Sequence, residues 1–177
     1  GSVYRRQDDI RNALKYHQEA LDKALKIKNP TTSIKKSISI SQNSMGNIYI
    51  SLKQYKLALQ EFSKSIVFQK ELDNKLGLAI NYQNIGNAQE ELGNLEDAIK
   101  NYHKSLENNN LINSKIGKII CSYSIANVLV KQKKYKQAFK TVDTVLQSAI
   151  NQKDKYYLSN TYNTLGLTQI YLNKLLE

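Results

Sequence analysis

The sequence predicts an all-α protein built as a solenoid of repeated helix pairs. Small residues return every 40 positions, and three further series of residues keep the same step. Self-similarity at a period of roughly 20–50 residues is typical of an array in which one supersecondary unit is stacked. The single proline also favours helices, because proline removes a helix hydrogen bond. The four series are Gly46, Gly86, Ala126 and Gly166; Ala58, Ala98 and Ala138; Tyr55, Leu95 and Tyr135; and Asn47, Asn87 and Asn127.

The first predicted helix covers residues 10–27 and is interpreted as the second helix of an incomplete unit. Its inner face is expected to carry Ala13, Ala20 and Leu21, and Val3 with Tyr4 would be the remnant of the preceding helix. Residues 29–32 form the following loop, in which Thr31 or Thr32 is a candidate helix cap because a threonine hydroxyl can accept a backbone hydrogen bond.

Apolar residues at spacings of three and four predict the remaining helices. In the first complete unit, one helix ends near residue 53 with Met45, Tyr49 and Leu52 on its inner stripe. A second helix begins at Tyr55, and its expected stripe is Leu57, Ala58, Phe62, Ile66 and Phe68 or Gln69. Further helices are predicted over residues 77–92, 95–108, 114–131, 135–152 and 155–172, with a tight turn at Gly93 and Asn94.

These helices divide the chain into a single array covering residues 1–177. It comprises a partial repeat at 3–30, repeats at 31–72, 73–112 and 113–152, and a final unpaired helix at 153–175. Residues 1–2 are interpreted as a cloning scar. The small residues of the 40-residue series are expected at helix crossings, where they let backbones approach more closely than the usual 8–10 Å. Tyr55, Leu95 and Tyr135 are expected to seal the turn of each hairpin.

Two segments resemble the tetratricopeptide repeat (TPR) family. The first is Gly46-Asn-Ile-Tyr49, followed by Leu52, Tyr55, Ala58 and Phe62; the second is Gly86-Asn87, followed by Leu92, Leu95, Ala98 and Tyr102. The period matches a long variant of the family. The run Leu76-Gly77-Leu-Ala79, followed by Asn84-Ile85-Gly86-Asn87, resembles one found in spindle-orientation adaptors, in bacterial peptide-sensing regulators and in TPR regions of bacterial sensor kinases and transcription regulators. The departures are the missing family tryptophan, replaced by Gln42, Tyr82, Ser122 and Tyr162, and Ala126 with Val142 in place of a glycine and an aromatic residue.

The resemblance implies a right-handed superhelix whose concave groove is lined by the first helix of each unit. The side chains expected in that groove bind a partner through amides and apolar groups. Asparagine offers both a donor and an acceptor, so Asn47, Asn87 and Asn127 would bind the peptide groups of an extended segment. Alternatively, these amides join one unit to the next or face water. The predicted groove residues are Asn43, Asn47, Ile50, Gln83, Asn87, Glu90, Tyr123, Asn127, Val130 and Asn163, with Leu167 and Ile170 further along.

The carboxylate clamp of chaperone-type TPR domains needs lysines on this face. Asn43, Gln83, Tyr123 and Asn163 stand at the equivalent positions, so this binding mode is rejected. The net charge of +11 attracts acidic partners or nucleic acid. However, the dense basic stretch at residues 131–140 lacks arginine and free stacking aromatics, so a solvated face is preferred over a nucleic-acid site.

No residue set points to catalysis, a cofactor or a metal. His17 and His103 have no third ligand at metal-binding spacing. Cys121 lies in an apolar run and is expected to be buried. The sequence has no glycine-rich phosphate loop or nucleophile elbow.

The sequence therefore predicts a non-catalytic protein-interaction module that binds a peptide or partner domain. The resemblance favours the sensory or regulatory region of a signalling protein such as a bacterial histidine kinase or transcription regulator. A homodimer formed through the terminal helix is the first alternative, and nucleic-acid binding ranks last. The fragment carries no predicted membrane segment or signal peptide, and both a cytoplasmic and an extracytoplasmic location stay open.

Overall fold

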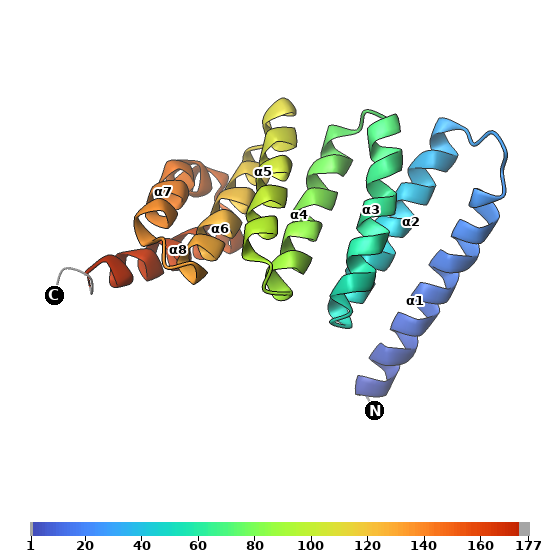
Figure 1. Ribbon diagram of the computed structural model, residues 1–177, viewed down its shortest axis with the longest axis horizontal. Helices are drawn as coiled ribbons and strands as arrows, with labels where there is room; N and C mark the ends of the chain where they lie inside the picture. The colour runs from blue at the N-terminus through green and yellow to red at the C-terminus, as the bar shows by residue number, and fades with distance from the viewer. Residues whose placement is uncertain (1, 174–177) are drawn as a thin grey trace.

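Eight helices make up the computed structural model, which describes the backbone of residues 2–173 and the side chains of residues 9–173 (Figure 1). The described part contains no strand, which confirms the all-α prediction. Predicted and observed helix ends agree within about three residues from residue 55 to residue 173, and Tyr55, Leu95 and Tyr135 each open a helix. The helices are α1 (Ser2–Leu25), α2 (Thr32–Ser51), α3 (Tyr55–Glu71), α4 (Lys75–Glu91), α5 (Leu95–Leu111), α6 (Lys115–Lys131), α7 (Tyr135–Gln152) and α8 (Lys155–Asn173).

The helices form two layers. Consecutive helices pack side by side along the molecule, and α2, α4, α6 and α8 also touch one another in succession. Among the described residues, α3, α5 and α7 make no such contacts with each other. A curved double layer brings the helices of its inner side closest together. The layer of α2, α4, α6 and α8 therefore lines the inner, concave side of the array.

A residue in the left-handed backbone conformation follows each helix from α2 to α7. These residues recur every 20 positions. After each of the first five, the amide of the next residue closes a six-residue turn, for example from Asn94 N to Gln89 O at 2.9 Å. This hydrogen bond is the signature of a Schellman cap. The left-handed residues are Lys53, Asp73, Gly93, Asn113, Lys133 and Lys153.

Replacing Lys133 by glycine is expected to stabilise the protein. Lys133 adopts a φ of 60°, where a Cβ atom crowds the backbone and glycine does not. The gain should be about 0.5–1 kcal/mol in the free energy of unfolding, reduced by the larger entropy that glycine loses on folding. The matched change is Gly93→Ala at φ 79°, where a Cβ meets no atom within 4 Å, so only backbone strain is added. Urea denaturation should give opposite signs for the two variants.

The regular spacing of small residues reflects the placing of aromatic rings. A Cβ added to Gly46 would lie 2.3 Å from the ring of Phe62, and one added to Gly86 would lie 2.4 Å from Tyr102. Both rings are fully buried. In the next unit Ala126 stands at the glycine position and Val142 at the position of the aromatic ring, and both are fully buried. The side chain on the first helix is therefore larger where the facing side chain on the second helix is smaller. The expected close contact is therefore confirmed for Gly46 and Gly86, although the partner is an aromatic ring rather than Ala58 or Ala98.

Gly166 breaks this rule, because a Cβ at this position would meet nothing within 4 Å. The expectation of a crowded crossing there is wrong. Three expectations about the first half of the chain are also wrong. Val3 and Tyr4 lie in the continuous helix α1 and not in a separate preceding helix, Ala20 is exposed, and Leu57 is 41% exposed. Of the two residues proposed to end the stripe of α3, Gln69 is buried.

The hydrophobic core of the described residues consists of three separate clusters, each between neighbouring helices. Leu21, Ile38 and Met45 join α1 to α2. A second cluster around Phe62 joins α2, α3 and α4, and a third around Tyr102 joins α5, α6 and α7. Thr31 caps α2 by accepting from Ile34 N at 3.4 Å, as one of the two predicted caps.

Candidate functional site

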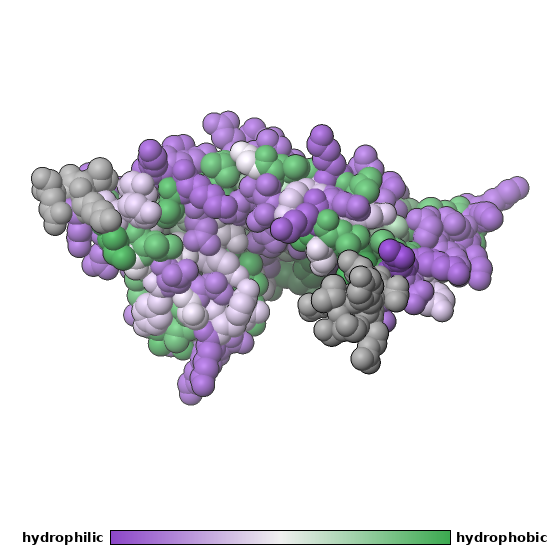
Figure 2. All heavy atoms as spheres, turned by 90° about the horizontal axis from the view of Figure 1, so that it is seen from below, coloured by the Kyte–Doolittle hydropathy of each residue, from purple (hydrophilic) through white to green (hydrophobic). Residues whose placement is uncertain are grey.

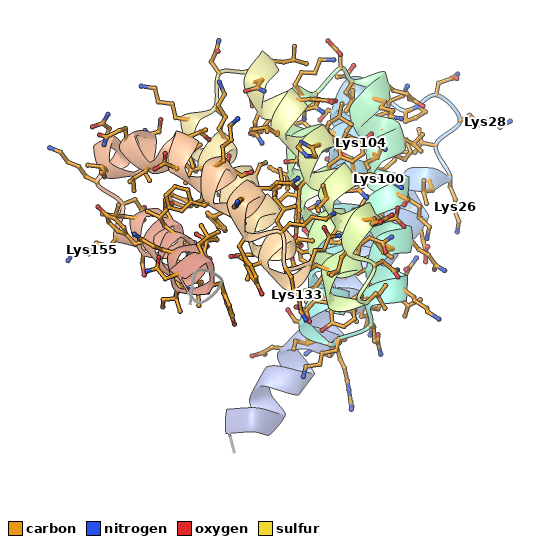
Figure 3. The ribbon with its side chains drawn as sticks, turned by 60° about the vertical axis from the view of Figure 1, so that its left-hand side comes forward. Lys26, Lys28, Lys100, Lys104, Lys133 and Lys155 are labelled. Atoms are coloured by element: carbon orange, nitrogen blue, oxygen red, sulfur yellow. The ribbon has the colours of Figure 1, made fainter. Side chains whose placement is uncertain are left out.

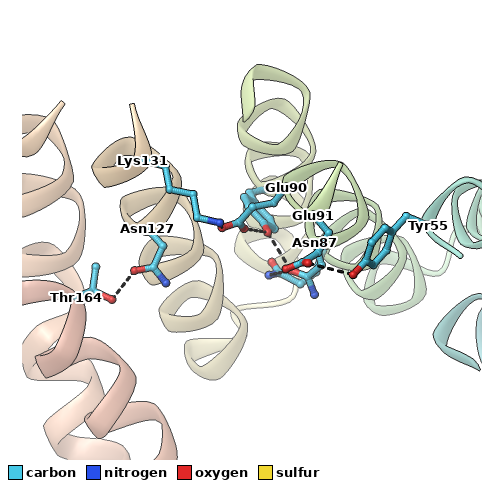
Figure 4. Close-up of polar contacts among 9 residues, drawn as sticks. Tyr55, Asn87, Glu90, Glu91, Asn127, Lys131 and Thr164 are labelled. Atoms are coloured by element: carbon cyan, nitrogen blue, oxygen red, sulfur yellow. Dashed lines mark hydrogen bonds and ion pairs between the residues drawn. The ribbon is translucent and has the colours of Figure 1, made fainter. Parts of the chain in front are cut away.

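The three asparagines of the predicted ladder lie on helices of the inner layer, and Figure 4 shows two of them, Asn87 and Asn127, with their polar contacts. Asn84 Nδ2 donates to Asn47 Oδ1 at 3.0 Å, and Thr164 Oγ1 donates to Asn127 Oδ1 at 2.8 Å. The hydroxyl oxygen of Tyr102 lies 2.9 Å from Asn87 Oδ1. The alternative that these amides join one unit to the next is therefore realised for the carbonyl oxygens of Asn47 and Asn127, whereas Asn87 Oδ1 lies beside Tyr102 of its own unit.

The amide nitrogens of the ladder differ in their contacts. Asn47 Nδ2 donates to Asn43 Oδ1 at 3.2 Å, and Asn43 Nδ2 in turn donates to Asn81 Oδ1 at 2.9 Å. Neither Asn87 Nδ2 nor Asn127 Nδ2 donates to another described side chain or backbone group at hydrogen-bond distance. Because Asn87 is exposed and Asn127 half-exposed, two donors one repeat apart face the groove.

Glu90 belongs to a charged network within the array. Its carboxylate accepts from Tyr102 Oη at 2.7 Å and pairs with Lys131 Nζ at 2.7 Å, and its side chain is only 15% exposed. The neighbouring Glu91 accepts from Tyr55 Oη at 3.1 Å across the α3–α4 junction. Burial and the nearby Glu90 carboxylate raise the pKa of Tyr102 far above its usual value near 10. The network therefore joins α4, α5 and α6.

Alkaline solution is expected to destabilise the fold through Tyr102. The raised pKa keeps this phenol neutral in the folded state, whereas the unfolded phenol loses its proton near pH 10. Above that pH the unfolded state binds fewer protons, so the free energy of unfolding falls by about 1.4 kcal/mol per pH unit for this group. Tyr102→Phe should be less stable at neutral pH and show a shallower alkaline slope. Denaturant midpoints between about pH 9 and 11 measure both, and an unchanged slope would contradict the assignment.

A stripe of aliphatic side chains crosses the inner face in the N-terminal halves of α2, α4 and α6. Two pockets open there, one of about 250 Å³ between α2 and α4 and one of about 220 Å³ between α4 and α6. They share Leu76 and Ile80, which are 53% and 46% exposed. The sequence interpretation missed this stripe, although Ile40, Ile80 and Ile120 keep the 40-residue period and could have revealed it. Figure 2 shows apolar side chains gathered in separate patches among hydrophilic ones.

The apolar groove residues that the sequence predicted have other surroundings. Ile50 packs against the Phe62 cluster, and Tyr123 and Val130 pack against the Tyr102 cluster. Burial raises the pKa of Tyr123. These three side chains stand at the edge of the core, while Asn163 is exposed on α8. Gln83 is tied across the α4–α6 junction, where its Nε2 donates to Ser124 Oγ at 2.9 Å. Whether any of these residues touches a partner stays a prediction.

The basic side chains are spread over the molecule. The lysines labelled in Figure 3 come from the loop after α1, from α5, from the turn before α7 and from the start of α8; they are Lys26, Lys28, Lys100, Lys104, Lys133 and Lys155. Cys121 is buried as expected, 1% exposed, and burial raises the pKa of its thiol. Among the described residues no three His, Cys, Asp or Glu side chains come together as a metal site. None of the described helices has the length and apolar character required to span a bilayer.

Comparison with known families supports this architecture. The family model of the tetratricopeptide repeat matches residues 37–110, which include α3, α4 and most of α2 and α5. Residues 37–110 are tetratricopeptide repeats, and the whole chain has a TPR-type fold. No curated protein matches it significantly over its sequence. TPR domains are generally non-catalytic, and the fold of this array supports a protein-interaction repeat module.

Solved structures share the fold of this TPR array. A crystal structure of BtubC from P. vanneervenii superposes with a TM-score of 0.83 at 16% identity, over 97% of this chain and 70% of BtubC. The apo form of RapI superposes with a TM-score of 0.79 at 21% identity, over 90% of this chain. The TPR array spans only 43% of RapI, less than half of that protein. At these identities the likeness extends to the fold alone.

The terminal helix α8 exposes apolar side chains on the side away from α6 and α7. Tyr162, Leu167 and Ile170 are 49%, 39% and 54% exposed. Association of two TPR arrays through α8 therefore stays a prediction. Residues 174–175 of the predicted final helix lie outside the described residues.

Proposed function

We propose that the inner face of α2, α4 and α6 binds a peptide or a partner domain and that the array carries out no reaction. One observation carries this proposal: amide donors and exposed aliphatic side chains occur together on that face and repeat with the period of the units. Asn87 Nδ2 and Asn127 Nδ2 offer two donors one repeat apart, and the apolar stripe of Leu76 and Ile80 lies on the same helix as Asn87.

The free donors support recognition of an extended segment. Backbone carbonyls of an extended chain have no internal partner, whereas those of a helix are already hydrogen-bonded. Two amide nitrogens one repeat apart can each bind one such carbonyl without selecting a side chain. The apolar stripe then supplies the area whose burial stabilises the complex, at about 25 cal/mol per Å² before the costs of association.

Peptide selection tests the proposed function without a known partner. A random peptide library displayed on phage is selected against the whole chain, and the recovered peptides are titrated by fluorescence anisotropy. Binding should be lost in Ile80→Glu, which places a charge on the exposed stripe, and retained in Val67→Glu. Val67 lies on α3 in the outer layer and is 53% exposed, so it is close to Ile80 in size and exposure. Selected peptides that bind Ile80→Glu as tightly as the parent chain would contradict the proposal.

The asparagine ladder is expected to contribute through several weak contacts. Replacing Asn87 or Asn127 by alanine should lower the affinity for a selected peptide about two- to tenfold, since one hydrogen bond contributes about 0.5–1.5 kcal/mol net. The triple variant that also changes Asn47 should weaken binding far more. Tyr102 retains Glu90 and Thr164 retains the carbonyl of Asn160 in this variant, so a cooperative melting curve is expected. If the triple variant folds and binds with unchanged affinity, the asparagines only join the units and do not bind the peptide.

We further propose that this module serves a signal-transduction protein, with the array as its sensory or regulatory region. The support is the resemblance of residues 76–79 and 84–87 to a run found in TPR regions of bacterial sensor kinases and regulators. The full sequence of the natural protein is the direct test. A kinase or a DNA-binding domain on the same chain would agree with the proposal, and fusion to an unrelated structural domain would contradict it.

A further inference from the structure

The two pockets of the inner face are copies of one socket. Nine residues line the pocket between α2 and α4, and the residue 40 positions after each of them lines the pocket between α4 and α6. The aliphatic wall is Ile40, Leu76 and Ile80 in the first socket and Ile80, Ile116 and Ile120 in the second. Ile80 therefore belongs to both sockets.

The depth of each socket depends on a glycine. Gly77 and Gly117 lie where a Cβ would be 2.2 Å from Gln69 Oε1 and 1.9 Å from Asn109 Oδ1, respectively. A side chain there would push the preceding helix away or fill the socket. The next junction does not reproduce these residues, since Tyr157 stands at the glycine position and Asn160 at the isoleucine position. The array thus presents a pair of equivalent sockets.

The size of each socket suits one large apolar side chain. Volumes of about 250 and 220 Å³ exceed the ~150 Å³ of an engineered cavity that holds benzene. The exposed fractions of 51% for Ile40, 53% for Leu76 and 40% for Ile116 show that the walls lie open to solvent. Filling both sockets would cover this surface.

The second socket has basic surroundings. None of their lining residues is charged, and Lys75 and Lys115 directly precede the wall residues Leu76 and Ile116. Lys75 pairs with Asp73, whereas Lys115 has no carboxylate partner within the described part. Lys118 follows the socket residue Gly117, and the sequence from residue 108 to residue 118 contains Lys115, Lys118 and no acidic residue. The charge complement of the second socket is therefore a carboxylate.

We infer that the occupant is an extended acidic segment of a partner protein that places two apolar side chains, three residues apart, in the two sockets. α2, α4 and α6 touch in succession, and packed helices lie about 8–10 Å apart, so the two sockets are separated by about that distance. Three residues of an extended polyproline II chain advance about 9 Å and return a side chain to the same face. This inference rests on the proposed function and adds the chemistry and spacing of the ligand.

Synthetic peptides test the pairing of the sockets. The probe is a fluorescein-labelled glutamate-rich peptide with two leucines three residues apart, measured by anisotropy with the whole chain. Serine in place of either leucine should weaken binding about tenfold or more, because a buried leucine contributes about 1.5–3 kcal/mol. Moving the leucines to adjacent positions should weaken binding similarly, and lysine in place of glutamate should abolish it. Equal affinities within this set would overturn the inference.

Variants of the chain assign each leucine to a socket. Ile40→Ser should affect only the first socket and Ile120→Ser only the second, so each should make one leucine of the peptide dispensable. Ile80→Ser should impair both, while Val67→Ser on the outer layer should bind as the parent chain does. A peptide that responds to none of these variants would overturn the inference.

The outcome also separates this inference from the proposed function. If library-selected peptides depend on Ile80 but carry neither the paired apolar residues nor acidic residues, the groove still binds peptides and the paired-socket inference fails. If neither the selected nor the designed peptides depend on Ile80, both fail.

Discussion

Gly86→Ala should lower the free energy of unfolding by about 1–3 kcal/mol, whereas Gly166→Ala should raise it by roughly 0.5–1 kcal/mol. The two glycines occupy the same position of their units but have different surroundings. A methyl group at position 86 meets the ring of Tyr102 at 2.4 Å, and this ring is fully buried and cannot move outward. A methyl group at position 166 meets nothing within 4 Å, so only the better helix propensity of alanine remains.

Thermal denaturation followed by circular dichroism measures this contrast. For a chain of this length, 1 kcal/mol corresponds to a shift of about 2–4 °C in Tm. The Gly166→Ala variant serves as the control for helix propensity, because both substitutions are made inside a helix. Equal shifts of the same sign in both variants would show that the ring of Tyr102 does not limit the space at position 86.

The second large effect concerns Phe62. Phe62→Val should destabilise the protein by about 2–4 kcal/mol, because it removes several buried carbon atoms and leaves a cavity beside Gly46. Adding Gly46→Ala should recover part of the loss, since the added methyl group fills the vacated space. The double variant reproduces the alanine and valine that the chain itself places at positions 126 and 142.

A double-mutant cycle measures this recovery. Gly46→Ala alone should destabilise the protein through its clash with Phe62, so the coupling energy between the two positions should be favourable and exceed about 0.5 kcal/mol. Additive effects would indicate that the two positions adapt independently. In that case the pairing of Ala126 with Val142 would not reflect a shared space between the two helices.

The fold was predictable from the sequence because each helix pair repeats the same local pattern. The 40-residue series located the helix starts at Tyr55, Leu95 and Tyr135, and the left-handed turns fall at the predicted breaks. The burial of individual residues was less predictable. Leu57 is exposed because the array packs each helix against two neighbours, and periodicity within one helix does not identify the second contact.

The candidate site shows the same limit. The position of Asn47, Asn87 and Asn127 on the inner layer was implied by the resemblance to TPR proteins, but the donors to their carbonyl oxygens include residues of other helices, which one helix does not reveal. Thr164, which donates to Asn127 Oδ1, lies 37 residues away. The sockets were missed because their walls combine residues of two successive units, such as Ile40 and Leu76.

The series of separate core clusters also governs how the array deforms. Each cluster joins only neighbouring helices, so a small rotation at one junction changes the next only through the helix that they share. Such rotations add along a solenoid and change its curvature without exposing a core. The array can therefore bend, and bending changes the distance between the two sockets. A ligand of fixed length would therefore select one curvature of the array and stiffen it.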